Sequence, residues 1–149
     1  QRQMCIRDRL LTDSGEEFPD LYASEIKSLN LNADLVVLSS CDTGNGRNVN
    51  GEGLLSLSRP FLIAGADQVI STLWKVDDLA TADFMEKFYT YYLRDGLGAS
   101  QALHMAKLAL QCSAEWSHPY YWGAFTLHGD WNDNRSVNEA DDMSCSTLL

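Results

Sequence analysis

The residues with the clearest chemical potential lie in the stretch ADLVVLSSCDTGNG, residues 33–46. An apolar run leads through two serines to Cys41, and Asp42, Thr43 and Gly44 follow in what reads as a tight turn. A nucleophilic thiol needs solvent access, a base that forms the thiolate, and donors for a developing oxyanion. A strand end would hold Cys41 rigidly, and its backbone amide is a candidate oxyanion donor. We therefore treat Cys41 as a candidate nucleophile.

Two other interpretations of the same stretch stay open. A free cysteine is commonly a buried core residue, in which case Cys41 has no chemical role. A glycine-rich loop after a strand can also bind phosphate through backbone amides, and CDTGNG has that character. However, no GxGxxG or Walker pattern is complete, and no lysine closes the loop.

The three histidines and the segment LWKVDD are the other candidates for a site. We interpret His104 as a solvated surface residue, whereas His118 and His128 could reach a cleft, although nothing in their spacing selects them. Asp77 and Asp78 could line a pocket that attracts a basic side chain. The simpler interpretation of these acids is helix capping, and that of Trp74 is packing.

The elements that must position these residues alternate between strand and helix. Apolar patterns predict a short helix within 20–31, a buried strand at 33–40, a helix within 54–66, a strand at 68–74, helices at 78–94 and 99–111, and a strand at 121–128. This alternation predicts an α/β domain with a mainly parallel sheet. In such sheets functional groups gather at the carboxyl ends of strands, where Cys41 is expected.

The overall composition limits the classes of partner. With 149 residues and a formal net charge of -10, the chain lacks the basic surface that nucleic acids and anionic membranes require, and it suits a basic partner or peptide. The four cysteines are scattered, which predicts neither a metal site nor a disulfide framework, and we expect reduced thiols, no cofactor and a cytoplasmic location. No apolar run is long enough to span a membrane.

Both ends differ from the middle of the chain. The opening QRQMCIRDR is basic in an otherwise acidic chain, and we interpret residues 1–9 as a non-native leader. Residues 132–149 are polar and aperiodic, which predicts a disordered tail.

Four segments together resemble the C-terminal part of the CHAT domain, a family of the caspase-like cysteine peptidase superfamily that is similar in places to separase. They are ADLVVLSSCDTGNG, GEGLLSLSRPFLIAGADQVISTLWKVDDLATADFMEKFY, GASQALHMAKLAL and HPYYWGAFTLHGDW. The resemblance implies that residues 10–131 form this part of a caspase–haemoglobinase fold, a mainly parallel sheet flanked by helices. It also implies a Cys/His dyad and a protein or peptide substrate, and many family members carry TPR repeats.

The resemblance assigns roles to individual residues. Cys41 becomes the nucleophile and backbone oxyanion donor within the motif Ser40, Cys41, Asp42, Thr43, Gly44, and Asp77 and Asp78 lie where the superfamily shapes its specificity pocket. The family histidine precedes the cysteine, but no histidine precedes Cys41 here. We therefore expect that the N-terminal portion of the domain is missing and that the chain alone is an inactive fragment of a cysteine endopeptidase. The alternative is a non-catalytic CHAT-like interaction or signalling module.

Overall fold

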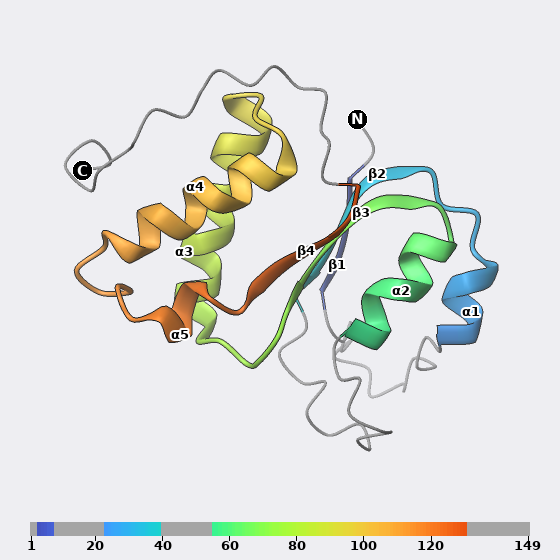
Figure 1. The fold of residues 1–149 in the computed structure, drawn as a ribbon, viewed down its shortest axis with the longest axis horizontal. Helices are drawn as coiled ribbons and strands as arrows, with labels where there is room; N and C mark the ends of the chain where they lie inside the picture. The colour runs from blue at the N-terminus through green and yellow to red at the C-terminus, as the bar shows by residue number, and fades with distance from the viewer. Residues whose placement is uncertain (1–2, 8–22, 40–54, 131–149) are drawn as a thin grey trace, which may run out of the picture. The chain divides into compact units, whose positions relative to one another are not determined.

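The computed structural model describes residues 3–7, 23–39 and 55–130 (Figure 1). The elements in chain order are β1 (Gln3–Arg7), α1 (Ala23–Ser28), β2 (Ala33–Ser39), α2 (Leu55–Ile63), β3 (Ala66–Thr72), α3 (Asp78–Tyr89), the π-helix η2 (Thr90–Arg94), α4 (Ala99–Gln111), α5 (Pro119–Trp122) and β4 (Phe125–Gly129). The chain divides into two compact units, residues 1–75 with 128–130 and residues 76–127 with 131–149.

Three strands of the first unit pair in parallel. The sheet has the order β1-β2-β3-β4, and β2 pairs in parallel with both β1 and β3. The backbone amide of Asp130 donates to the carbonyl oxygen of Asp67 at 3.1 Å, so β4 ends where β3 begins. The predicted α/β class is therefore confirmed, and the sheet is mixed rather than wholly parallel.

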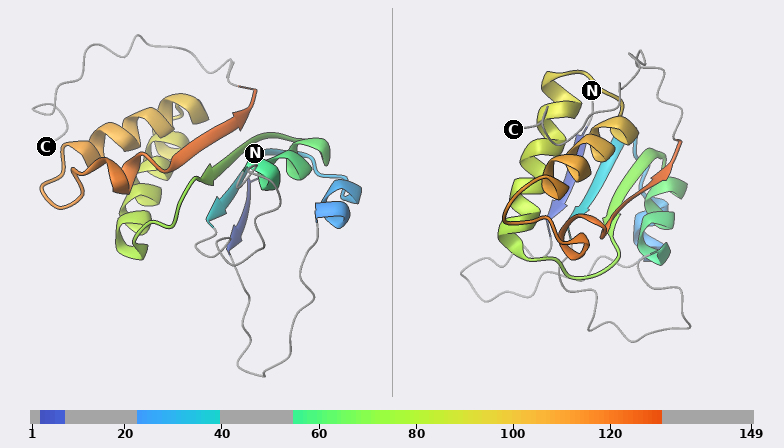
Figure 2. Two further views of the ribbon diagram at one scale, coloured as in Figure 1. Left: turned by 60° about the horizontal axis from the view of Figure 1, so that its bottom comes forward. Right: turned by 60° about the vertical axis from the view of Figure 1, so that its left-hand side comes forward.

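One face of the first unit's strands is covered by α1 and α2, which lie side by side (Figures 1 and 2). Val36 and Val69 are fully buried and belong to one apolar cluster with Ile26 of α1 and Phe61 of α2. Leu35, on the other face of β2, is fully buried as well. Because β2 is buried on both faces, its sequence shows no alternation of polar and apolar residues.

A glycine turn sets where β3 begins. Gly65 has a φ of 104°, in the region that favours glycine, and the amide of Leu31 donates to the carbonyl of Ala64 at 2.7 Å. The strand therefore starts at Ala66 and ends at Thr72, two residues earlier at each end than the predicted 68–74. Sequence alone could not give this register, because the apolar run continues past the last paired residue.

The second unit is built around α3 and α4. Phe84 of α3 stacks on Phe125 with ring centroids 3.7 Å apart, and both rings are buried. The apolar stripe predicted for 99–111 is confirmed, since the residues on it are buried in α4: Ala99, Ala102, Leu103, Ala106, Ala109 and Leu110. The predicted helix 78–94 is also found, but its last turn is the π-helix η2.

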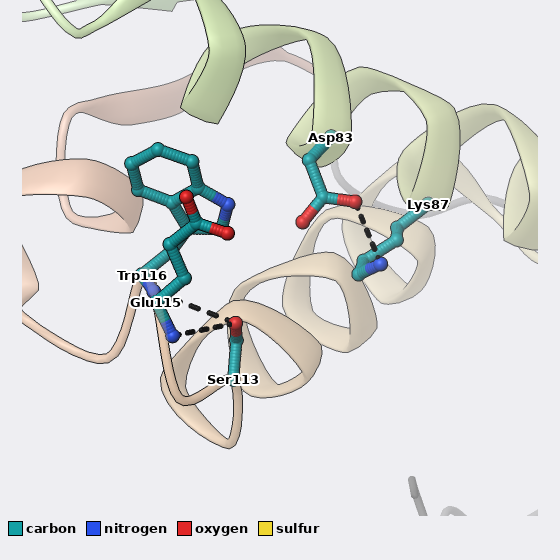
Figure 3. Close-up of polar contacts among 5 residues, drawn as sticks. All are labelled: Asp83, Lys87, Ser113, Glu115 and Trp116. Carbon is teal, nitrogen blue, oxygen red and sulfur yellow. Dashed lines mark hydrogen bonds and ion pairs between the residues drawn. The ribbon is translucent and has the colours of Figure 1, made fainter.

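Polar contacts fix the surface of this unit. Lys87 pairs with Asp83 one helical turn earlier at 2.8 Å, and the Ser113 hydroxyl accepts from the amides of Glu115 at 3.2 Å and Trp116 at 3.4 Å (Figure 3). The Ser113 contacts turn the chain immediately after α4.

Two predictions in this unit are wrong. The predicted strand 121–128 is a short helix followed by a shorter strand, because Pro119 occupies the first turn of α5 and the amide of Gly123 donates to its carbonyl at 2.8 Å. Cys112 is disulfide-bonded, so the expectation that all the thiols are reduced does not hold at this position.

The predicted domain limits concern parts of the chain that the structure covers only partly. Within the proposed leader, Gln3–Arg7 forms β1 and pairs with β2 from Gln3↔Leu35 to Arg7↔Ser39. Pairing of these residues does not show whether residues 1–9 are native to the domain, so the non-native leader stays a prediction. The proposed tail, 132–149, lies outside the described residues.

Candidate functional site

The carboxyl ends of β2 and β3 define the edge at which the candidate nucleophile was predicted. Val37 lies opposite Ile70 in the parallel ladder, so Ser39 and Thr72, each two residues further on, end their strands at the same level. The strand that leads into the motif is thus found as predicted, in the middle of the order β1-β2-β3. Cys41 and its neighbours Ser40, Asp42, Thr43 and Gly44 lie outside the described residues.

Asp77 caps α3. Its Oδ1 accepts from the backbone amides of Leu79 at 2.9 Å and Ala80 at 3.3 Å, and its carbonyl oxygen accepts from the Thr81 hydroxyl at 2.8 Å. An aspartate at this position satisfies amides that the helix leaves unpaired, and its charge suits the positive end of the helix dipole. The capping interpretation of Asp77 is therefore confirmed.

Asp78 is the first residue of α3, and its side chain is exposed. The role of Asp77 and Asp78 in a specificity pocket stays a prediction, because the two acids belong to the second unit and the cysteine segment to the first. Capping by Asp77 uses one carboxylate oxygen, so this role and substrate contact do not exclude each other.

The described histidines have structural or surface positions. His104 is exposed on α4, as predicted. His118 caps α5, where its Nδ1 accepts from the amide of Tyr120 at 3.2 Å. His128 lies near the end of β4, which is beside the start of β3, and therefore away from the edge where β2 and β3 end. Of the three, only His128 belongs to the unit that contains β2.

The residues directly after β3 differ from their prediction. The chain bends after Thr72, and Leu73 and Trp74 are 43% and 38% exposed, although Trp74 was interpreted as a packing residue. The usable signal in the sequence is two large apolar residues immediately before the charged residues Lys75, Asp77 and Asp78. Because these two residues continue the apolar pattern of β3, the sequence alone does not show that the strand ends before them.

Titration and metal binding give no further candidate in the described part of the chain. Burial lowers the pKa of Lys107 on α4, because its ammonium group loses hydration there. Among residues 3–7, 23–39 and 55–130, no group of three histidine, cysteine or acidic side chains could hold a metal ion. In the same ranges, no helix is long and apolar enough to cross a membrane.

Comparison with known proteins gives one family and two relatives. Residues 7–130 match the CHAT domain. Tetratricopeptide repeat protein 28 of Mus musculus is 44% identical over 109 residues, and the protein of the same name in Homo sapiens is 40% identical over 109 residues. Each alignment covers 73% of this chain but only 4% of the relative. No solved structure matches the chain.

The family match fits the geometry described above. It spans β2, β3 and every element of the second unit, and it includes the cysteine motif, Asp77 and Asp78. The relatives are proteins named for TPR repeats, so the predicted association with such repeats is found among them. The chain therefore belongs to the CHAT domain family, which is related to the caspase-like peptidases.

Proposed function

We propose that the protein that carries this domain is a cysteine endopeptidase and that Cys41 is its nucleophile. The observation that carries the proposal is the end of β2, a buried central strand that leads directly into the motif Ser40–Gly44. Two extended residues span at most about 7 Å, so covalent geometry keeps Cys41 close to Ser39 at this edge. The membership in a peptidase-related family supports the same assignment.

The chemistry follows from a Cys/His dyad. The Cys41 thiolate attacks the scissile carbonyl carbon, a carbon–sulfur bond forms, and the backbone amide of Cys41 donates to the oxyanion. The carbon–nitrogen bond then breaks, and the histidine gives its proton to the leaving amine. Water attacks the thioester, its proton passes to the histidine, and the carbon–sulfur bond breaks to release the acid and the thiol.

The histidine of the dyad is the part that this sequence does not supply. No histidine precedes Cys41 in these 149 residues, and His128 lies at the opposite end of β3 from the edge that leads into the motif. The 149 residues alone should therefore hydrolyse no peptide. In this proposal a longer protein supplies the histidine and the rest of the caspase–haemoglobinase fold that the family implies. The substrate in this proposal is a protein or peptide, and TPR repeats would present it.

The experiment compares the full-length protein with its Cys41→Ser variant on a library of fluorogenic peptides and on unfolded protein. We expect turnover that Cys41→Ser abolishes. His104→Ala is the matched control, because His104 is exposed on α4 and has no role in the proposal, and it should leave the rate unchanged. Turnover that survives Cys41→Ser, or no turnover in either protein, would contradict the proposal.

A second candidate function is a non-catalytic interaction module. The observation in its favour is that the relatives are named for repeats rather than for a peptidase activity. The rate of alkylation of Cys41 as a function of pH separates the two. A nucleophile reacts as a thiolate of low pKa, whereas a cysteine retained for packing is protected.

A further inference from the structure

We infer that Glu115, Trp116, Tyr120 and Tyr121 form a binding site for the guanidinium group of an arginine in a basic segment of a partner protein. These four residues lie in the part of the chain that connects α4 to β4, and they are called the aromatic corner. The aromatic corner belongs wholly to the second unit, so it depends neither on the proposed function nor on how the two units are arranged.

The first observation is the arrangement of three aromatic rings. The rings of Trp116 and Tyr121 have centroids 5.0 Å apart and planes inclined by 67°, and those of Tyr120 and Tyr121 have centroids 5.6 Å apart and planes inclined by 84°. The rings thus meet nearly at right angles. Tyr120 is 48% exposed, and the other two residues are partly exposed. The face of an exposed tyrosine or tryptophan ring attracts a cation, so this arrangement offers a cation ring faces in more than one direction.

The second observation is that hydrogen bonds hold the backbone of the aromatic corner. The Ser113 hydroxyl accepts from the amides of Glu115 and Trp116, and His118 Nδ1 accepts from the amide of Tyr120 at 3.2 Å. The residues are therefore positioned before a ligand arrives, which lowers the conformational entropy lost on binding.

The third observation is negative charge without a nearby cation in the sequence. Glu115 is exposed, and among residues 3–7, 23–39 and 55–130 its carboxylate has no hydrogen-bond or ion-pair partner. Asp83 of α3, which points toward this turn in Figure 3, is paired with Lys87. No lysine or arginine follows Lys107 up to the end of β4 at Gly129, and the whole chain has a formal net charge of -10. The charge of this region therefore complements a basic partner.

The combination of rings and a carboxylate favours arginine over lysine. A guanidinium group is planar, so it stacks on an aromatic ring while its N–H groups donate to a carboxylate such as that of Glu115. A lysine ammonium group is more strongly hydrated and has no flat face to stack. The partner segment should therefore contain arginine.

The test measures the binding of fluorescein-labelled peptides to the 149-residue chain by fluorescence anisotropy. Three peptides alternate glycine with arginine, with lysine or with citrulline, which has nearly the shape of arginine but no charge. The indole N–H resonance of Trp116 in a proton–nitrogen NMR spectrum reports contact with the aromatic corner. We expect the arginine peptide to bind more tightly than the lysine peptide and to shift this resonance, and we expect the citrulline peptide to do neither.

Two variants test the residues themselves. Glu115→Gln and Tyr120→Leu should each weaken binding of the arginine peptide about 2- to 5-fold, which is typical of an exposed ion pair or cation–π contact. Glu86→Gln is the matched control for charge, because Glu86 is an exposed acid on α3 in the same unit.

Tyr91→Leu is the matched control for the ring. The carbonyl oxygen of Tyr91 accepts from the amide of Leu97 at 3.1 Å, which places Tyr91 near the start of α4, whereas Tyr120 follows the end of that helix. The helix between them is about 20 Å long. Both control variants should bind the arginine peptide as the unchanged protein does.

Several results would overturn the aromatic corner: no binding of the arginine peptide, equal binding of the citrulline peptide, equal or tighter binding of the lysine peptide, or binding without a shift at Trp116. Equal losses with Glu115→Gln and Glu86→Gln would also overturn it, because the peptide would then respond only to net charge. Tyr120 packs on Tyr121, so circular dichroism must show that Tyr120→Leu is folded. If this variant does not fold, Glu115→Gln decides, since Glu115 is exposed.

Discussion

Removal of the Asp77 side chain gives the sharpest test of the local structure at the start of α3. Asp77→Ala deletes the acceptor for the amides of Leu79 and Ala80, which lie 2.9 and 3.3 Å from Oδ1. Loss of a capping side chain typically costs about 1 kcal/mol, within a range of roughly 0.5–2. For a chain of about 150 residues, this corresponds to a decrease of roughly 2–4 °C in the melting temperature.

The assay is thermal and urea unfolding followed by circular dichroism, with Asp77→Ser and Asp77→Asn as matched variants. Serine and asparagine also cap helices, so both should recover most of the stability that alanine loses. Asparagine removes the charge as well, and it should lose a few tenths of a kcal/mol through the helix dipole. Equal stability of the alanine and serine variants would refute the reasoning, because the side-chain oxygen would then contribute nothing.

The same set of variants addresses the predicted specificity pocket. Asp77→Asn keeps a capping oxygen but has no charge, so its effect on substrate recognition is separated from its effect on folding. If Asp77 holds a basic side chain, Asp77→Asn should slow labelling of Cys41 by a peptidyl chloromethyl ketone probe with arginine next to the reactive group. It should leave the rate with the matching leucine probe unchanged. No change with either probe would leave Asp77 with the capping role alone.

Two further predictions concern stability. Gly65→Ala should destabilise the protein by about 1–3 kcal/mol, because Gly65 has a φ of 104° and a Cβ there would overlap the carbonyl oxygen of Leu31. Gly96→Ala, at a φ of 72° with nothing within 4 Å of the added Cβ, should cost less, and an equal loss in urea unfolding would contradict the argument. Lys107→Met should raise stability at neutral pH, because desolvation lowers the pKa of this lysine from 10.5 and its charged form is the less stable one in the folded protein. As pH rises through the lowered folded-state pKa towards 10.5, Lys107 loses its proton in the folded protein before it does so in the unfolded protein. The stability gained by Lys107→Met should therefore become smaller at high pH. A stability gain that does not change with pH would refute desolvation of Lys107 as its cause.

The sequence by itself determined the class of the fold and most of its elements. The buried run in β2, the amphipathic stripe of α4 and the capping acid before α3 carry local signals, because their periodicity or residue type is set within one element. The family was also accessible from sequence, since its motifs are contiguous and the match spans residues 7–130. Cys41 was singled out in the same way, by its position after a buried strand.

The tertiary structure decided the features that depend on contacts between segments distant in sequence, namely where the strands end and which residues are exposed. Strand pairing placed the ends of β2 and β3 at one level and ended β3 at Thr72, which left Leu73 and Trp74 exposed at that edge. Pairing of the chain near Asp130 with Asp67 set β4 beside the start of β3 and took His128 away from the edge. The sequence does not show whether a neighbouring strand covers an apolar residue, because burial depends on which distant segments pack against that residue in the folded protein.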